Sequence, residues 1–480
     1  MRWAVRIAVL AMVAISAWQR WQILDATPFP VGVDGYFYPI EVRSLLEHGA
    51  LAYPASPLTF WWMAPFALIT DPIVGAKLGA AIGCALSGVP AYFAGKRLGG
   101  GCAAAGLVAC ALAVTSADSA YLSFEFVKQG IGLTVMLATV AAIAADRRWA
   151  AIACGAVATL LAHKLAFVML VILGGPMLVV RVRARLFGRR LLYVLAGAVV
   201  AAIALAIVGL AMPKRLPSPG DVALVRGLFG RAHWDLPALA AQNVTLAFRH
   251  EALAAGVLCI AAAFVVHRER DPMRRAFGWS VVALGVAIAL PWLDVADPQG
   301  LGFRLRIVAF VPLALAAAIV TREVAVPRKG AILAIAAAAL FAIGAARRLT
   351  EGEVVMHPAL AAATANAAGK IPPGATVIVP ERRILFPIEW YTRAPVSLRP
   401  EHVPIAQRVR IFGLTWAGGD GSPLDRALDA ARLDPSVAPP ISLHAGHRNG
   451  LVIVTEPTWD WLLAHLPADA RAHYARWPTL

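Results

Sequence analysis

Long apolar stretches follow one another through most of the chain. A membrane-spanning helix needs about 20 predominantly apolar residues, and eleven segments meet or approach that length. They lie near 3–24, 72–95, 101–118, 127–145, 149–163, 165–180, 191–211, 251–266, 276–293, 307–320 and 331–346. Of the 480 residues, 60% are hydrophobic and 15% are charged, whereas soluble domains carry about 25% charged residues. The sequence therefore predicts an all-α polytopic membrane domain and excludes a disordered chain.

The segment 149–180 permits two interpretations. It could form one long tilted helix or two helices separated at His163 and Lys164. We favour two helices, because the side of the membrane assigned to every later loop depends on this break.

Lys and Arg gather in every second loop between the apolar segments. The net charge is +16, from 44 Lys and Arg against 28 Asp and Glu, and short basic loops stay cytoplasmic. The loops that share a side with the N-terminus are 96–97, 146–148, 181–190, 267–275 and 322–329. This distribution predicts a cytoplasmic N-terminus, and it argues against a basic face that binds nucleic acid. Most basic residues are Arg, which is typical of a GC-rich bacterial genome and suggests an inner-membrane protein.

The N-terminal apolar run could also be a cleaved signal peptide, since it combines a basic start with an apolar stretch. Trp18 and Arg20 fit an interfacial anchor better than a cleavage site. The same topology places the first external loop, 25–71, and the C-terminal residues on the periplasmic side.

Residues 349–480 have a different pattern from the membrane domain over 1–348. Alternating apolar runs at 376–379 and 451–454 predict strands, and 423–432 and 459–475 have helical patterns. We expect a small α/β domain that stands on the periplasmic face of the membrane.

The first external loop carries the strongest functional signal. Asp34 stands at the expected start of a helix that Gly49 ends. Its carboxylate could be only a helix cap. However, membrane insertion does not require a long amphipathic loop that begins with an acid and ends in a Tyr53-Pro54-x-x-Pro57 turn.

The sequence Asp34-Gly-Tyr-Phe-Tyr, followed by Arg43 and by Leu46-Glu-His-Gly49, resembles the first external loop of GT-C superfamily glycosyltransferases. The pattern is similar to oligosaccharyltransferase catalytic subunits, and the turn at 53–57 is similar to protein mannosyltransferases and lipid A aminoarabinose transferases. The resemblance implies that Asp34 is the catalytic acid or base. It also implies transfer of one hexosyl or pentosyl unit from a polyprenyl-phosphate donor to a lipid, glycan or protein acceptor. Tyr36, Arg43 and His163 are candidate substrate-binding residues.

A second acid, Glu125, lies in the next external loop, where the family often has another carboxylate. Together with Asp34 it could hold a divalent cation such as Mg²⁺ or Mn²⁺ through oxygen ligands. Alternatively, it is an interfacial acid paired with Lys128 one helical turn later.

Three basic residues at the external ends of the predicted spans are candidates for binding the lipid phosphate. The guanidinium forks of Arg304 and Arg306 match phosphate geometry, and Lys164 could add a second cation. Each Arg could instead extend to the lipid headgroups, and Lys164 could lie in a solvated turn. The resemblance favours one Arg, and we expect Arg304 before Arg306. Asp118 and the loop residues Arg226, Arg231, His233 and Asp235 remain open candidates.

Two rival functions belong to other classes. A secondary transporter or lipid flippase would favour internal repeats and helices broken at mid-bilayer, but the ionisable residues here lie at span ends. A non-catalytic scaffold is the third alternative. The tail has no Trp-Trp-Asp-Tyr-Gly block, and its nearest sequence, Glu389-Trp-Tyr-Thr-Arg393, resembles a motif of bacterial GT-C proteins. This difference disfavours transfer of a whole oligosaccharide to Asn.

Overall fold

The computed structural model describes residues 2–32, 34–183, 249–289, 301–324, 358–380, 382–413, 421–442 and 451–476. The chain forms two compact units. The helical unit contains Met1–Ala26 and Glu41–Gly352, and the mixed unit contains Thr27–Ile40 and Glu353–Leu480. A piece of the first external loop therefore folds together with the C-terminal residues, although more than 300 residues separate them.

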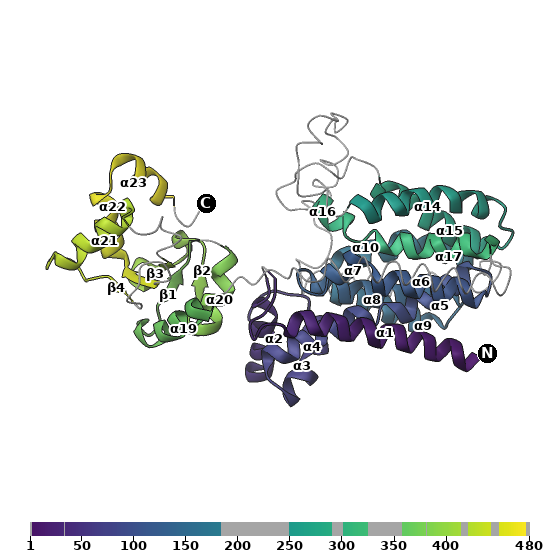
Figure 1. Cartoon of the computed structure of the whole chain (residues 1–480), viewed down its shortest axis with the longest axis horizontal. Helices are drawn as coiled ribbons and strands as arrows, with labels where there is room; N and C mark the ends of the chain where they lie inside the picture. The colour runs from purple at the N-terminus through teal and green to yellow at the C-terminus, as the bar shows by residue number, and fades with distance from the viewer. Residues whose placement is uncertain are drawn as a thin grey trace. The chain divides into compact units, whose positions relative to one another are not determined.

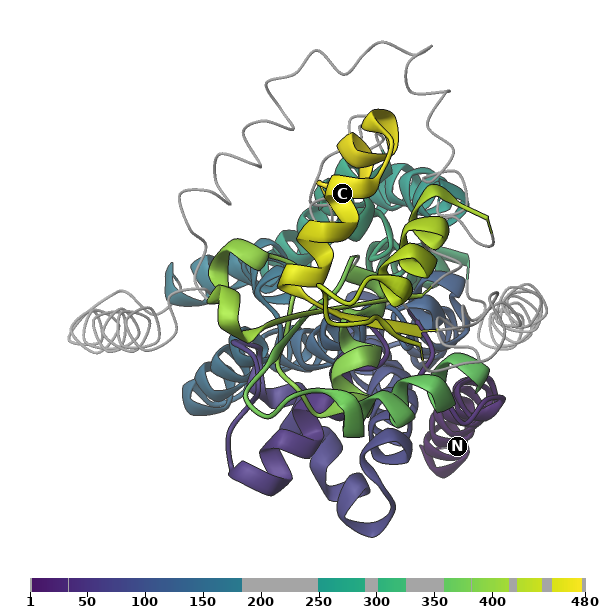
Figure 2. The ribbon, with the colours of Figure 1, turned by 90° about the vertical axis from the view of Figure 1, so that its left-hand side faces the viewer.

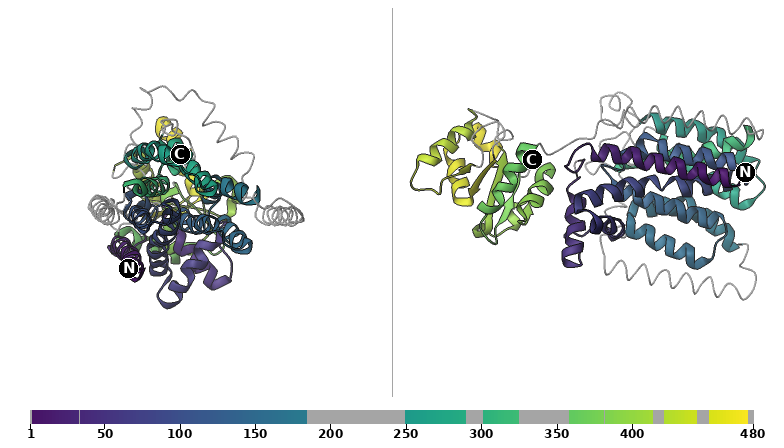
Figure 3. Two further views of the ribbon diagram at one scale, coloured as in Figure 1. Left: turned by 90° about the vertical axis from the view of Figure 1, so that its right-hand side faces the viewer. Right: turned by 60° about the horizontal axis from the view of Figure 1, so that its bottom comes forward.

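The helical unit is a bundle in which the long helices lie side by side (Figures 1 and 3). Its helices are α1 (Arg2–Asp25), α3 (Pro57–Ile69), α4 (Pro72–Ala85), α5 (Gly88–Leu98), α6 (Ala103–Thr115), α7 (Ala117–Tyr121), α8 (Val127–Ala144), α9 (Trp149–Ala162), α10 (Lys164–Arg183), α14 (Arg249–His267), α15 (Pro272–Ala289), α16 (Leu301–Arg306) and α17 (Phe310–Val324). Helix α2 (Phe37–His48) contains the boundary between the units, after Ile40. Within the described residues, five helical stretches are long and apolar enough to cross a membrane.

The observed helices confirm the expected break between 149–163 and 165–180. Helix α9 ends at Ala162, His163 has an extended backbone, and α10 begins at Lys164. The expected segment 72–95 is interrupted by a turn at 86–87, and 101–118 is interrupted at Ser116. The expected spans 191–211 and 331–346 lie outside the described residues.

Helix α3 lies inside the loop that the sequence predicted to be external, and it is apolar. It packs closely on α4, because a Cβ on Gly75 would lie 2.4 Å from the backbone of Ala67. A Cβ on Gly79 would likewise meet Met63, and the indole of Trp62 donates a 2.8 Å hydrogen bond to the Gly79 carbonyl. Small residues that permit such a close approach are typical of helix contacts in membranes.

The mixed unit is built on a five-stranded sheet in the order β2-β1-β3-β5-β4. The strands are β1 (Thr376–Ile378), β2 (Val396–Ser397), β3 (Arg408–Gly413), β4 (Ile441–Ser442) and β5 (Leu451–Thr455). Strand β1 runs parallel to both of its neighbours, whereas β5 is antiparallel to β3 and β4. The predicted strands at 376–379 and 451–454 are thus confirmed.

Helices cover both faces of this sheet (Figure 2). They are α19 (Pro358–Ala367), α20 (Arg382–Thr392), α21 (Pro423–Leu433), α22 (Glu456–His465) and α23 (Ala468–Tyr474). Alternate residues of β3 face opposite layers: Val409 and Ile411 pack in a cluster with α20, whereas Phe412 packs in a cluster with α21 and α22. The expected helix 459–475 is two helices, because Pro467 lies between α22 and α23.

Candidate functional site

Asp34 lies in a tight turn directly before α2. The Gly35 amide donates to the Gly32 carbonyl, and the Phe37 amide donates to the Asp34 carbonyl, both at 3.0 Å. Gly32 has a φ of 94°, and a Cβ on Gly35 would lie 2.6 Å from the Val31 carbonyl oxygen. Only glycine fits these two positions without strain, so the sequence around Asp34 specifies its backbone conformation. The predicted helix after Asp34 is confirmed, and Gly49, with a φ of 68°, follows its end.

Tyr36, directly before α2, and Phe37, its first residue, pack against α20 within the mixed unit. The Tyr36 hydroxyl lies 3.0 Å from the Tyr391 hydroxyl, and the two ring centroids are 5.8 Å apart. The Phe37 ring centroid lies 5.1 Å from that of Phe386, and Tyr36 also approaches Trp390 at 6.5 Å. We call Tyr36, Phe37, Phe386, Trp390 and Tyr391 the aromatic cluster.

Burial raises the pKa of Tyr36, and its hydrogen bond with Tyr391 raises it further. Burial also raises the pKa of Tyr391, although its bond to Tyr36 opposes that shift. Both phenols are therefore neutral at physiological pH. Tyr36, a candidate substrate-binding residue, is only 2% exposed in this arrangement.

The remainder of α2 fixes the returning chain in the helical unit. The Glu41 carboxylate, which is fully buried, accepts hydrogen bonds from the amides of Ala52 at 2.8 Å and Tyr53 at 3.2 Å. Arg43, another candidate substrate-binding residue, is 9% exposed in the same helix. Glu41 was not predicted from the sequence, although an acid among the apolar residues of a helix was the available signal.

Arg304 lies over the first turn of α8. Its guanidinium carbon is 5.3 Å from the centroid of the Phe126 ring, a cation–π distance. Its backbone carbonyl accepts a 3.0 Å hydrogen bond from the Gln129 side-chain amide. Glu125 is the residue before Phe126 and is half-buried. The structure therefore brings the predicted phosphate-binding Arg304 close to the segment that carries the predicted second acid.

His163 and Lys164, at the junction of α9 and α10, lie beside the same end of α8. A Cβ on Gly132 would lie 2.8 Å from the Cβ of His163, so the α9–α10 junction packs against α8 at this point. Gly132 is three residues after Gln129, about 4.5 Å along a helix axis. Lys164 is exposed at the start of α10, whereas Arg306 is 1% exposed. Lys164 is therefore more open to a ligand than Arg306.

Arg20 connects the end of α1 to the chain around α7. Its guanidinium donates hydrogen bonds to the hydroxyls of Ser123 at 2.8 Å and Ser119 at 3.0 Å, and to the Val114 carbonyl at 3.2 Å. It is 2% exposed, so it is a buried structural group and not the interfacial anchor that the sequence suggested. Asp118, in the same region, is fully buried.

The predicted cytoplasmic loops meet one another in the helical unit. Glu269, between α14 and α15, forms an ion pair with Arg274 at 3.2 Å and a second with Arg322 at the end of α17. Arg181, at the end of α10, pairs with Asp146 at 2.7 Å. The predicted external segments also meet, since the Ala117 amide donates to Glu251 of α14 at 2.7 Å, in addition to the contact of Gln129 with Arg304. Each set of contacts joins segments that the sequence assigned to one side of the membrane, and which side that is stays a prediction.

A metal site is not evident among the described residues. They contain no group of three or more His, Cys, Asp or Glu side chains that could hold an ion. Asp34 and Glu125, the expected ligands, belong to different units. The divalent cation therefore stays a prediction. The open candidates Arg226, Arg231, His233 and Asp235 lie outside the described residues.

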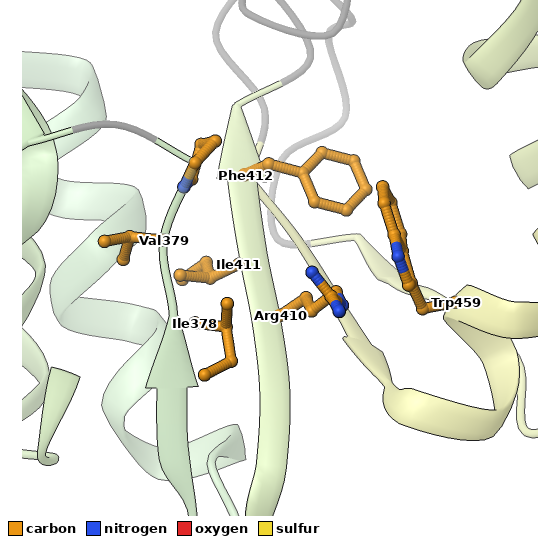
Figure 4. A pocket seen from close by; sticks show the side chains of 7 residues that line it. Ile378, Val379, Arg410, Ile411, Phe412 and Trp459 are labelled. Atoms are coloured by element: carbon orange, nitrogen blue, oxygen red, sulfur yellow. The ribbon is translucent and has the colours of Figure 1, made fainter. Parts of the chain in front are cut away.

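A hollow of about 200 Å³, open solvent included, lies in the mixed unit (Figure 4). It is lined by Ile378, Val379, Pro380, Arg410, Ile411, Phe412 and Trp459. Its one charged group, Arg410, donates to both carboxylate oxygens of Glu456 at 3.1 and 3.0 Å and lies 4.8 Å over the Trp459 ring. Since that charge is compensated and no predicted site residue lines the hollow, it is not the candidate site.

The fold is shared with solved membrane glycosyltransferases. ArnT from Cupriavidus metallidurans, solved with undecaprenyl phosphate, aligns at a TM-score of 0.52 and 16% identity over 93% of this chain and 97% of ArnT. The oligosaccharyltransferase of Archaeoglobus fulgidus, solved with Zn and sulfate, aligns at a TM-score of 0.52 and 13% identity. The alignment covers 82% of this chain and 63% of the oligosaccharyltransferase. The oligosaccharyltransferase AglB from Archaeoglobus fulgidus, solved with an inhibitory peptide and a dolichol-phosphate, aligns at a TM-score of 0.53 and 13% identity. The alignment covers 83% of this chain and 65% of AglB.

These neighbours are GT-C glycosyltransferases, so the chain has the GT-C fold and the resemblance is confirmed at that level. The chain spans nearly all of ArnT and about two thirds of the oligosaccharyltransferases. No protein-family model and no curated protein matches the sequence. The expected number of eleven spans is not tested, because two of them lie outside the described residues.

Proposed function

We propose that the chain is an integral-membrane glycosyltransferase that moves one sugar from a polyprenyl-phosphate carrier to an acceptor hydroxyl at the periplasmic face of a bacterial inner membrane. The observation that carries the proposal is the GT-C fold, shared over 93% of this chain with ArnT, whose structure contains undecaprenyl phosphate. The contacts of Arg304, at the end of α16, with Phe126 and Gln129 support a lipid-phosphate site in the helical unit.

Asp34 is the proposed general base. The acceptor hydroxyl gives its proton to the Asp34 carboxylate while its oxygen forms a bond to the anomeric carbon of the sugar. The bond between that carbon and the carrier phosphate breaks, and the phosphate leaves with the electron pair. A carboxylate within hydrogen-bond reach of the hydroxyl is sufficient for this proton transfer, and inversion at the anomeric carbon is what the resemblance implies.

Arg304 is the proposed partner of the leaving phosphate. Its guanidinium can donate two aligned hydrogen bonds to phosphate oxygens, and it stabilises the charge that develops as the bond breaks. Lys164 is the proposed second cation, because it is exposed beside the same end of α8. Arg306, which is buried, is the weaker candidate.

The distribution of charged loops supports a periplasmic location for this chemistry. In the predicted cytoplasmic loops, Arg274 and Arg322 both pair with Glu269. The Arg304 region belongs to the loops assigned to the opposite side. Glycosyl transfer from a polyprenyl-phosphate donor outside the cytoplasm needs no soluble nucleotide sugar.

The test uses purified protein in liposomes that contain undecaprenyl-phosphate-linked monosaccharides. We expect release of undecaprenyl phosphate together with a glycosylated acceptor, and Arg304→Ala should greatly weaken both. The matched control is Arg275→Ala, which removes an exposed Arg from a predicted cytoplasmic loop. Passage of the intact lipid-linked sugar across the bilayer without its cleavage would contradict the proposal and identify a flippase.

A further inference from the structure

The segment 27–40 is joined in sequence to helices of the helical unit but folds with the mixed unit. We propose that α20 is a positioning element for Asp34, and that its aromatic side chains Phe386, Trp390 and Tyr391 fix the turn that carries this carboxylate. The inference rests on the proposed function in so far as Asp34 is the base. It assigns α20 a role in catalysis without any contact of its own with substrate.

Helix α20 has two apolar faces, and each has a different partner. Ile384 and Ile388, four residues apart, are 2% and 0% exposed and pack in the cluster that covers the sheet. Phe386 and Trp390, also four residues apart, form a second stripe, because residues at this spacing share one side of a helix. The first stripe anchors α20 to the sheet, and the second receives the start of α2.

The aromatic contacts that α20 makes with Tyr36 and Phe37 are specific. The Phe37 and Phe386 rings are tilted by 56° at 5.1 Å, and the Tyr36 and Tyr391 rings are tilted by 56° at 5.8 Å. Both distances lie in the range at which aromatic pairs attract each other beyond simple burial. The 3.0 Å bond between the Tyr36 and Tyr391 hydroxyls then fixes the rotation of the Tyr36 ring.

The fixed rings are connected to Asp34 through a short and constrained backbone. Tyr36 is two residues from Asp34, a reach of at most about 7 Å. The Phe37 amide bonds to the Asp34 carbonyl, and Gly35 lies so close to the Val31 and Gly32 carbonyls that no Cβ fits there. A shift of either ring therefore moves the Asp34 backbone with it. General-base catalysis is sensitive to displacements of about 1 Å.

Backbone hydrogen exchange tests the inference without using activity. The amides of Gly35 and Phe37 report on the turn, because both donate hydrogen bonds within it. In full-length Phe386→Ala, we expect these amides to exchange about tenfold faster, the factor that corresponds to the loss of one aromatic pair. Amides of β3 and β5 should keep their wild-type rates, since Ile384 and Ile388 still anchor α20 to the sheet.

Two further variants make the result decisive. Tyr391→Phe removes only the hydroxyl that bonds to Tyr36, and should accelerate exchange at the turn by about threefold, in line with one hydrogen bond. Tyr474→Phe removes a buried hydroxyl from the cluster on the other face of the sheet, and should leave the turn unchanged. If Phe386→Ala also accelerates exchange of the β3 and β5 amides, the sheet itself is perturbed, and the result for Tyr391→Phe then tests the inference. Unchanged exchange at Gly35 and Phe37 in Tyr391→Phe and in any folded Phe386→Ala overturns the inference.

Turnover separates this inference from the proposed function. Phe386→Ala should lower kcat about tenfold without changing the KM for the lipid-linked donor, whereas Phe386→Tyr, which keeps the ring, should restore kcat. Retained turnover in Asp34→Asn would contradict the proposed function whatever the exchange rates are. Lost turnover in Asp34→Asn together with unchanged exchange in Tyr391→Phe and a folded Phe386→Ala would contradict the positioning role alone.

Discussion

The side-chain amide of Gln129 donates a 3.0 Å hydrogen bond to the backbone carbonyl of Arg304, 175 residues further along the chain. Because the bond reaches the backbone, it fixes the place where the Arg304 side chain begins, while the Phe126 ring lies 5.3 Å from the guanidinium carbon. Phe126, directly before α8, and Gln129, in its first turn, therefore contact the guanidinium and the backbone of the residue that we assign to the leaving phosphate.

Replacing Gln129 with Ala should weaken binding of undecaprenyl phosphate by about two- to tenfold, since one hydrogen bond contributes about 0.5–1.5 kcal/mol. The fold should persist, because the backbone bonds of α8 are unaffected. Titration of the purified protein with undecaprenyl phosphate measures the change. The control is Thr139→Val in the same helix, whose hydroxyl bonds only to the Val135 carbonyl at 2.9 Å. Equal affinities for the two variants would show that Arg304 does not depend on Gln129.

Replacing Glu269 with Gln should lower the free energy of unfolding by about 2 kcal/mol, because Arg274 and Arg322 lose the charge of the buried carboxylate with which they pair. Glu269 is 9% exposed and accepts hydrogen bonds from Arg274, Arg322 and the Asp271 amide. Thermal unfolding in detergent measures this loss. Glu323→Gln is the matched control, since its carboxylate is 56% exposed and 4.0 Å from Arg322, and such pairs contribute little.

The pH dependence of unfolding follows from the same cluster. Burial alone would raise the pKa of Glu269, but the Asp271 amide, Arg322 and Arg274 together hold it below its ordinary value of 4.5. A lowered pKa in the folded state means that the stabilisation is present above about pH 4.5 and is lost as the pH falls through the folded pKa. The acid-side decline in Tm should therefore be shallower in Glu269→Gln than in the wild type. Equal acid-side slopes of Tm against pH in the two proteins would contradict this stabilising role of Glu269.

Replacing Gly35 with Ala should reduce turnover by at least about tenfold, because the added Cβ would lie 2.6 Å from the Val31 carbonyl oxygen and 2.9 Å from that of Gly32. Relief of such a clash moves the backbone at a cost of about 1–3 kcal/mol, and Asp34 is the adjacent residue. Steady-state kinetics measure the effect. Gly369→Ala serves as control, since nothing lies within 4 Å of a Cβ there. Full activity in Gly35→Ala would show that the turn geometry is not needed.

The arrangement of helices could largely be predicted from the sequence, because length, apolarity and charge act locally. The break at His163 was predictable from the alternation of charged loops. Helix α3, of 13 residues, was missed because it is shorter than a span and lies within a loop that is otherwise amphipathic. The interruption at Ser116 was missed because small and apolar residues lie on both sides of it. The interruption at Pro467 was missed because a helical pattern lies on both sides of it.

The supports of the candidate site could not be predicted. Gln129 and Arg304 are 175 residues apart, and Tyr36 and Tyr391 are 355 residues apart, so no local periodicity connects them. Gln129 carried a weak signal, because an amide in an apolar helix requires a partner, but the sequence does not identify that partner. The sequence around Trp390 and Tyr391 was noticed for its resemblance to other GT-C proteins, whereas the structure shows that it packs against the turn that carries Asp34.

In the proposed reaction, Asp34 removes the acceptor proton during transfer of a sugar from a polyprenyl phosphate. The most direct measurement compares the turnover of Asp34→Asn with that of Asp71→Asn in the liposome assay. Asp71 lies before α4, and its carboxylate accepts hydrogen bonds from the amides of Ile73 and Val74, a capping role that Asn can also perform. We predict that Asp34→Asn lowers turnover by at least about 100-fold, as expected for loss of a general base, while Asp71→Asn stays near wild type. Turnover of Asp34→Asn within a few-fold of wild type would contradict the claim.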